Sequence, residues 1–499
     1  MIALTLGEVR DLTGGALHGA PDDEAKVVDG TVTTDSRECG PGGLYVARVG
    51  ETSDGHAYVG AAAAAGAVAA LTSRVVDGLP CIVVDDVQTA FGRLARGVID
   101  RAPELRVIGI TGSSGKTSTK DLLASVLETV AETVAPVNSL NGEIGVPLTV
   151  CRVTPTTRFL VAEMGARGIG HIEYLTRIAP PQVAIVLNVG TAHVGEFGSR
   201  ANIARAKSEL PRAVPAEGLA ILNADDPLVR SMAQGLSCRV QLVGLAPDAD
   251  VRAEDVVLDE RGRAAYDLVA PQGRARITLR QSGAHHVGNS LAVAAAALEL
   301  GLSLDQVAAG LAGAGAVSRW RMEITERPDG VVVVNDAYNA NPDSMRAAID
   351  ALCSIAAEGR RWAVLGEMLE LGDESAAAHE AIGAYAAQRG IDHVVAVGEG
   401  ARAFGAPEWV ADIDAAHDLL AERLAPGDVV LLKSSRDSGL RWLGDRLAGI
   451  ALPQPGASAD GPRGGAGGTG HGTTDGWTDD GQDDGVADRA DVSGEAVNE

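Results

Sequence analysis

Residues 107–120 read VIGITGSSGKTSTK, an apolar strand pattern followed by a glycine-containing loop and the start of a helix. Glycines at 112 and 115 allow backbone N–H groups to turn toward a phosphate, and Lys116 can reach its terminal oxygens. The Thr117 hydroxyl can hold Mg²⁺ at the helix N-terminus. The full Walker pattern has one more glycine where this chain has isoleucine, so the match is to the shorter core G-x-x-G-K-T. The residues predicted to bind nucleotide phosphates are Gly112, Ser113, Ser114, Gly115, Lys116, Thr117 and Ser118.

Short apolar runs alternate with helical patterns after this loop. FLVAEMG, VAIVLNVG and LAILNADD read as buried strands, and residues 117–130 carry apolar side chains at helical spacing. The alternation restarts after residue 318 with GVVVVNDAYN, RWAVLGEM, DHVVAVG and DVVLLKSS. The first hundred residues have their own elements, including GGLYVARVG and an expected Ala-rich helix at 58–71. This order predicts α/β structure with parallel sheets covered by helices.

The pattern predicts three folded domains and a tail. We expect a small N-terminal α/β domain at 1–100, a central P-loop parallel-sheet ATPase-like domain at 101–317 and a C-terminal Rossmann-like domain at 318–452. Residues 453–499 are rich in Gly, Asp, Thr and Pro and carry ten acidic and two basic side chains. Such a segment buries too little apolar surface to offset its ordering entropy, so we expect disorder there.

The bulk composition excludes some classes of protein. A formal net charge of -25 argues against a nucleic-acid partner held by phosphate contacts. The five cysteines are scattered and never spaced as C-x-x-C, which favours a reducing compartment over a disulfide or zinc framework. No signal pattern and no apolar run of about 18 residues occurs. We therefore expect a cytoplasmic protein without membrane insertion.

Three polar residues near the predicted loop are candidates for catalysis. Glu163 ends a predicted strand, where a carboxylate is well placed to hold Mg²⁺; the alternative is a surface glutamate. His193 follows another strand, although a lone histidine is more often structural. Lys207 is one of only five lysines among 42 basic residues, and an amine can take up CO₂ as a carbamate whereas arginine stays protonated. The alternative for Lys207 is a helix lysine paired with Glu209.

The chain resembles the Mur ligase family over roughly residues 10–450, through motifs in the family's order and spacing. The motifs are TGSSGKTST, NSLNGEIGVPLT, AEMGARGIGHI, NVGTAHVGEFGS, AKSEL, HHVGNSLAVAAA, RWRMEI, NDAYNANPDSM and LGEMLELGDES. The resemblance implies ATP and two Mg²⁺ ions, one on Thr117 and Glu163 and one on His193 and a carbamylated Lys207. It further implies that Asn289 contacts adenine and that Arg321 and Asp336 hold the nucleotide from the C-terminal domain.

Other motifs indicate which members of the family the chain resembles most. Residues 33–56 are similar to the uridine-diphosphate-binding domain of the two late-acting ligases, with Ser36 and Arg37 as expected contacts; the alternative is a simple loop. NDAYNANPDSM is similar to the member that adds D-alanyl-D-alanine, whereas the D-Y-A-H-T-P-D and D-N-P-R motifs of the preceding enzyme do not occur. LLKSSRDSGL departs from the family's K-G-S-R-x-M: Lys433 and Arg436 match, whereas the glycine and the methionine do not occur. Further expected substrate contacts are Asn141, Tyr338, Asn339 and Asn341.

The activity that the resemblance implies is amide-bond formation. ATP would phosphorylate the carboxylate of UDP-N-acetylmuramoyl-tripeptide, and D-alanyl-D-alanine would attack the acyl phosphate in a monomeric enzyme whose domains close. One alternative is another ligase of the superfamily, the third-residue-adding enzyme or folylpolyglutamate synthase. The second is a catalytically inactive nucleotide-binding scaffold, which the presence of Lys116, Thr117, Glu163, His193 and Lys207 disfavours.

Overall fold

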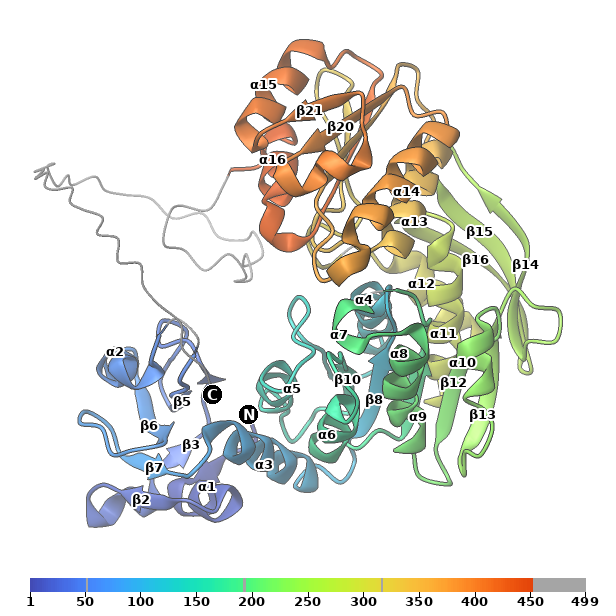
Figure 1. Ribbon diagram of the computed structural model, residues 1–499. Coiled ribbons are helices and arrows are strands. Elements are labelled where there is room, and N and C mark those ends of the chain that lie inside the picture. Colours follow the sequence, from blue (N-terminus) through green and yellow to red (C-terminus); the bar gives the residue numbers. More distant parts are fainter. Residues whose placement is uncertain (51–52, 192–193, 316, 452–499) are drawn as a thin grey trace, which may run out of the picture. The chain divides into compact units, whose positions relative to one another are not determined.

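The computed structural model describes residues 1–50, 53–191, 194–315 and 317–451. The predictions for His193 and for the tail at 453–499 lie outside these residues. The described chain forms three larger sheets, each from its own stretch of sequence, so the predicted α/β class with three domains is confirmed (Figure 1). Within the described ranges, no helix has the length and apolarity that crossing a membrane requires.

The first sheet has five strands in the order β2-β7-β6-β5-β4, parallel except for β2 against β7. Its strands are β2 (Ala16–His18), β4 (Val32–Thr33), β5 (Gly43–Val46), β6 (Ala67–Thr72) and β7 (Cys81–Val83). A separate antiparallel pair joins β1 (Leu4–Thr5) and β3 (Val27–Val28). The helices of this region are α1 (Leu6–Thr13), η1 (Pro21–Ala25), η2 (Gly55–Tyr58), α2 (Val59–Ala64) and α3 (Val87–Asp100).

The prediction of an Ala-rich helix at 58–71 is wrong for the second half of that range. The helix α2 ends at Ala64, and Gly66 takes a φ of 109°, which a side chain would disfavour. Residues 67–72 then form β6, which lies between β5 and β7 with most of its side chains buried. Alanine favours helices intrinsically, but burial between two strands overrides that preference here.

The second sheet has nine strands in the order β16-β15-β14-β13-β12-β11-β8-β10-β9. Its strands are β8 (Arg106–Thr111), β9 (Thr133–Val134), β10 (Phe159–Glu163), β11 (Val183–Val186), β12 (Leu219–Asn223), β13 (Arg239–Gly244), β14 (Val251–Leu258), β15 (Arg263–Ala270) and β16 (Gly273–Ser282). The strands predicted from the four apolar runs between residues 105 and 226 are confirmed, and all lie in the parallel part. The antiparallel hairpins β14–β16, which extend one edge, were not predicted (Figure 1).

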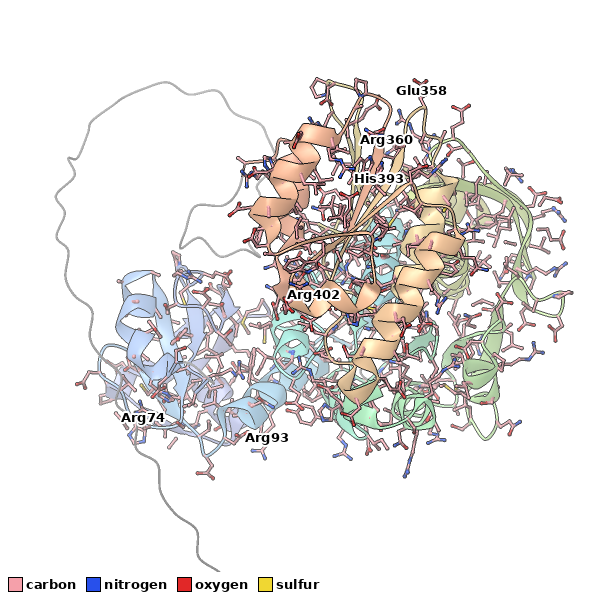
Figure 2. The ribbon with its side chains drawn as sticks, turned by 45° about the horizontal axis from the view of Figure 1, so that its top comes forward. Arg74, Arg93, Glu358, Arg360, His393 and Arg402 are labelled. Carbon is pink, nitrogen blue, oxygen red and sulfur yellow. The ribbon has the colours of Figure 1, made fainter. Side chains whose placement is uncertain are left out.

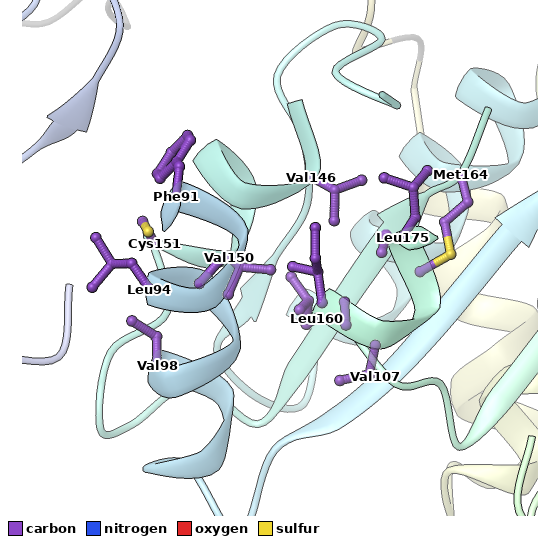
Figure 3. Packing of buried hydrophobic residues seen from close by; sticks show 14 of the residues in the cluster. Phe91, Leu94, Val98, Val107, Val146, Val150, Cys151, Leu160, Met164 and Leu175 are labelled. Atoms are coloured by element: carbon purple, nitrogen blue, oxygen red, sulfur yellow. The ribbon is translucent and has the colours of Figure 1, made fainter. Parts of the chain in front are cut away.

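Helices cover both faces of this sheet because its central strands bury side chains on both sides. Ile108 and Ile110 of β8 pack in one apolar cluster with α4 (Lys116–Glu128) and α11 (His285–Glu299), while Val107 packs in the other. Figure 3 shows the cluster that contains Val107, where Leu94 and Val98 of α3 lie beside Val150 of α5 (Gly145–Val150). The remaining helices are α5 (Gly145–Val150), α6 (His171–Ile178), α7 (Val194–Phe197), α8 (Arg200–Lys207), α9 (Glu209–Arg212), α10 (Pro227–Ser231) and α12 (Leu304–Gly313).

The third sheet has six strands in the order β17-β18-β22-β19-β20-β21, parallel except for β17. They are β17 (Glu323–Glu326), β18 (Val332–Asn335), β19 (Arg361–Gly366), β20 (His393–Val397), β21 (Glu408–Val410) and β22 (Val429–Lys433). Its helices are α13 (Pro342–Ser354), η3 (Gly372–Glu374), α14 (Ser375–Gln388), η4 (Glu399–Phe404), α15 (Ile413–Arg423), η5 (Arg436–Ser438) and α16 (Leu440–Leu447). The four strands predicted after residue 318 are confirmed.

A buried tryptophan organises one face of this third sheet. Trp362 is fully buried, and its ring centroid lies 3.9 Å from that of His393, with the Arg360 guanidinium carbon 5.1 Å away. Figure 2 shows Arg360 and His393 close to one another. The indole N–H of Trp362 donates to Asp428 Oδ2 at 3.0 Å, and Arg360 forms an ion pair with the same carboxylate. The buried polar groups are thereby paired.

Candidate active site

The phosphate loop has the conformation that its glycines allow. β8 ends at Thr111 and α4 begins at Lys116, with Gly115 between them at a φ of 79°. A Cβ at Gly115 would lie 2.8 Å from Asn289 Oδ1, so both the backbone angle and the space require glycine. Asn188, which follows β11, braces the loop because its Oδ1 accepts from the N–H groups of Ser113 and Ser114, each at 2.9 Å.

Asn188 was not among the predicted site residues. Its position directly after a buried parallel strand is the signal that could have identified it, because such strand ends meet at the edge where ligands bind.

Lys116 is enclosed at the start of α4. Its Nζ donates to the carbonyl oxygen of Gly112 at 2.8 Å, closing the loop onto itself. Burial lowers the pKa of this amine, and the nearby Arg321 lowers it further while Glu163 acts in the opposite direction. A phosphate placed at the loop would supply the negative charge that favours the ammonium form.

In the described structure, only one of the two carboxylate oxygens of Glu163 accepts hydrogen bonds. The residue is fully buried at the end of β10, which excludes the surface alternative. Its Oε1 accepts from Asn141 Nδ2 at 2.7 Å and from Ser139 Oγ at 2.8 Å, whereas Oε2 is buried and has no hydrogen-bond partner among the described residues. The Thr117 hydroxyl donates to the same Ser139 Oγ at 3.4 Å. The Thr117 hydroxyl oxygen and the unpaired Oε2 of Glu163 are oxygen ligands of the kind that a hard divalent cation binds. Ser139 was not predicted.

Lys207 ends α8 with 5% of its surface exposed. No hydrogen bond or ion pair reaches its amine from any residue that the structure describes. Burial, with the neighbouring Lys116 charge, holds the pKa of this amine well below its usual value. Glu209 is not its partner, since its carboxylate accepts from the N–H groups of Gly170 and Glu173 at 2.6 and 3.0 Å. The paired-helix-lysine interpretation is therefore wrong.

Arg321 reaches the phosphate loop from the C-terminal region, and Tyr338 packs against its guanidinium. Arg321 Nη2 donates to the Thr117 hydroxyl oxygen at 3.1 Å, and its guanidinium carbon lies 4.2 Å from the Tyr338 ring centroid. Asn289 of α11, whose side chain lies next to Gly115, is 7% exposed, and its buried Nδ2 has no hydrogen-bond partner within the described ranges. A nucleotide base could supply the missing acceptor.

Lys433 organises the backbone around Asp336. Its Nζ lies 2.8 Å from Asp336 Oδ2 and donates to the carbonyl oxygen of Asn339 at 2.7 Å. Burial lowers the pKa of Lys433, an effect that Asp336 opposes. Asn341 caps α13, since its Oδ1 accepts from the N–H of Ser344 at 2.9 Å. Lys433 and Asn341 thus shape the loop between β18 and α13.

One cavity of about 910 Å³ brings most of the predicted site residues together. Those that line it are Ser113, Ser114, Gly115, Lys116, Thr117, Ser118, Asn141, Glu163, Lys207, Asn289, Arg321, Asp336, Tyr338, Asn339 and Asn341. Ser36 and Arg37 are not among its lining residues, and Arg37 pairs with Asp35 at 2.6 Å in the first domain. That domain contributes Arg48 and Gln88 to the wall, neither of which was predicted.

Three family models match the chain. They are described as Mur ligase family, catalytic domain, at residues 30–97; Mur ligase middle domain, at 110–297; and Mur ligase, glutamate ligase domain, at 320–436. Among solved structures, crystal structure I of MurF from Acinetobacter baumannii is 33% identical with a TM-score of 0.81, covering 90% of this chain and 99% of that one. MurF from Thermotoga maritima, in complex with ADP, is 28% identical with a TM-score of 0.75, covering 85% and 98%.

Curated relatives extend over nearly the same length. The UDP-N-acetylmuramoyl-tripeptide--D-alanyl-D-alanine ligase of Mycobacterium tuberculosis (strain ATCC 25618 / H37Rv) is 46% identical over 500 residues, which cover 90% of this chain and 98% of that protein. The enzyme of the same name from Escherichia coli (strain K12) is 36% identical, covering 88% and 97%. The chain belongs to the Mur ligase family.

Proposed function

We propose that this protein is an ATP-dependent ligase that joins D-alanyl-D-alanine to UDP-N-acetylmuramoyl-tripeptide and releases ADP and phosphate. The observation that carries the proposal is the single cavity in which Lys116, Glu163 and Lys207 of the central domain face Arg321 and Asp336. Relatives named for this reaction match the chain over nearly its whole described length.

The chain's own residues would supply positive charge where the reaction develops negative charge. A carboxylate is a poor acyl donor, so ATP first converts it to an acyl phosphate that the amine of the dipeptide then attacks. Lys116 and Arg321 would neutralise the phosphates as charge moves onto the leaving ADP. Asn289 would bind the adenine, and Asp336, whose carboxylate Lys433 and the Met322 N–H hold in place, would bind the ribose.

The donor set at Thr117 and Glu163 fits Mg²⁺, because no residue in the described part of the chain pairs with the buried Oε2 of Glu163. We propose a second ion held by His193 and a carbamylated Lys207. When bound, the two ions would stabilise negative charge on the transferring phosphoryl group.

The burial of Lys207 supports the proposed carbamate. CO₂ reacts with a neutral amine, and burial lowers the pKa of Lys207 so that the neutral form is populated nearer to neutral pH. The carbamate is an anion. The positive charge of Lys116 disfavours a protonated Lys207, whereas it would favour this anion. An arginine at this position would remain a cation.

We place the substrates and domain boundaries as follows. UDP would bind the domain at 1–100 near Ser36 and Arg37, and the tripeptide would extend past Asn141 into the cavity. D-alanyl-D-alanine would bind at the loop 338–341 of the domain at 318–452, which we expect to close over the nucleotide bound at 101–317. We propose a cytoplasmic monomer.

Phosphate release in the presence of ATP, Mg²⁺ and UDP-N-acetylmuramoyl-tripeptide tests the proposal. We expect release to require D-alanyl-D-alanine and to yield a UDP-linked pentapeptide by mass spectrometry. Turnover only with a diamino acid and the UDP-linked dipeptide would assign the preceding reaction instead. Absence of turnover with every pair would contradict a ligase function.

A further inference from the structure

Residues 318–322, which we call the linker, connect the central and C-terminal regions in a strained conformation. Trp320 and Met322 take φ angles of 58° and 51°, values that bulky L-residues rarely adopt. Strain of this kind persists only where the surroundings enforce it, and it concentrates at functional sites. The contacts on each side of the linker identify what enforces it.

The first linker residue is held by the central domain. The N–H of Ser318 donates to Asp121 Oδ2 at 3.0 Å, and both residues are buried. Lys120, only 2% exposed, pairs with the other Asp121 oxygen and donates to the carbonyl oxygen of Pro136 at 2.9 Å and to Ser318 Oγ at 3.4 Å. The nucleotide site uses neither Lys120 nor Asp121, although both lie on α4 directly after the phosphate loop.

The next two residues are held by the C-terminal domain. Asp445 of α16 is 1% exposed, and its Oδ1 accepts from Arg319 Nη2 at 2.6 Å and from the Trp320 indole N–H at 3.0 Å. The Trp320 backbone N–H donates to Glu323 Oε2 at 3.0 Å, and its indole packs edge-on against Trp442 at 5.1 Å between ring centroids. The attachment therefore changes from one domain to the other between Ser318 and Arg319.

Arg321 lies between the two strained residues and returns to the central domain. Its Nη2 contacts the Thr117 hydroxyl oxygen at 3.1 Å, and its buried Nε has no hydrogen-bond partner in the residues that the structure describes. The linker thus places the Arg321 guanidinium at the nucleotide site, where the chain passes between domains. Its Nε remains available to donate a hydrogen bond to a ligand.

We propose that Asp121 and Asp445 are positioning residues that clamp the linker from opposite domains and thereby place the Arg321 guanidinium at the nucleotide phosphates. This inference rests on the proposed nucleotide-dependent function. Asp121 acts through Ser318, and Asp445 acts through Arg319 and Trp320. Because the two anchors belong to different domains, movement of either domain changes where Arg321 can reach.

Double-mutant cycles against Arg321 test the clamp in the full-length protein. Mg²⁺–ADP affinity is measured by calorimetry, and the melting temperature by thermal unfolding, for Asp121→Asn and Asp445→Asn in the wild-type and Arg321→Ala backgrounds. We expect each substitution to weaken ADP binding about tenfold when Arg321 is present and less than about twofold when it is absent. The loss of melting temperature should be equal in both backgrounds, since Asp121 and Asp445 contact Ser318, Arg319 and Trp320 and not Arg321 itself.

A matched control separates positioning from general stability. Asp428 is equally buried and makes the same kinds of contact, with an arginine and a tryptophan indole, away from the linker. Asp428→Asn should lower the melting temperature and leave ADP affinity unchanged. Equal weakening of ADP binding in both backgrounds, or by Asp428→Asn, would overturn the inference.

The two proposals fail in different ways. A wild-type protein that binds no ADP would contradict the proposed function itself. If Asp445→Asn does not fold, the Asp121→Asn cycle decides, because its outcome is independent of the packing around α16.

Discussion

Replacing Gly115 by alanine probes the geometry on which nucleotide binding depends. At a φ of 79°, an L-residue costs about 1–2 kcal/mol relative to glycine. The new Cβ would also lie 2.8 Å from Asn289 Oδ1, and moving that side chain off its rotamer costs about 0.5–1.5 kcal/mol. The total of about 1.5–3.5 kcal/mol reduces the population of the competent loop roughly 10- to 400-fold.

We expect Gly115→Ala to weaken ADP binding at least about tenfold in calorimetry, because the ligand must supply the energy that restores the loop. Gly288 is the matched control: it also lies in the cavity wall beside Asn289, but within α11, where an added Cβ meets no atom of the described chain within 4 Å. Gly288→Ala should stabilise the helix by about 0.5–1 kcal/mol. An unchanged ADP affinity for Gly115→Ala, measured on a folded variant, would refute the reasoning.

Three further predictions concern the acidic and amine groups of the cavity. Lys207→Ala should be nearly inactive in phosphate release and partly recovered by a short carboxylate in solution; full activity would contradict the carbamate. In CO₂-free buffer, Lys207→Met should raise the melting temperature most at low pH, with the gain shrinking as pH rises toward 10.5, since the folded-state pKa is lowered and protonation favours the unfolded chain. Glu163→Gln should raise the Mg²⁺ concentration required for half-maximal activity at least about tenfold, and an unchanged requirement would exclude Glu163 as a ligand.

The sequence predicted the parallel parts of the fold because their strands are continuous apolar runs between polar turns. The runs ending at Thr111 and Glu163 are buried on both faces, so their hydrophobicity is unambiguous. The hairpins β14–β16 alternate instead, as Ile277 and Leu279 are buried while Arg276 and Arg280 are exposed. Such a strand is half polar, and a search for apolar runs overlooks it.

The candidate site was predictable where the chemistry requires one residue type at a strand end. Lys116 and Thr117 follow the loop directly, and local sequence is sufficient to identify them. Ser139 and Asn188 act through hydrogen bonds to Glu163 and to the loop amides, and those partners are 24 to 75 residues away in the chain. Contacts of that range depend on tertiary packing, so the strand-end position of Asn188 could have marked it as a candidate, but no local pattern encodes which groups it binds.

The scarcity of lysine carries information that extends beyond Lys207. Lys26 is half-exposed and pairs with Asp23, but the other four lysines lie in enclosed surroundings where a cation is costly. Lys120 is compensated by Asp121.

Three of these amines line the cavity, and burial lowers the pKa of each. Glu163 opposes the effect at Lys116, and Asp336 opposes it at Lys433. No described carboxylate does so at Lys207, where the Lys116 charge adds to the effect of burial. Lys207 is therefore the amine that gains most from becoming an anion. If carbamylation occurs at one lysine of this chain, labelled CO₂ should be trapped at Lys207, while Lys116 and Lys433 stay unmodified.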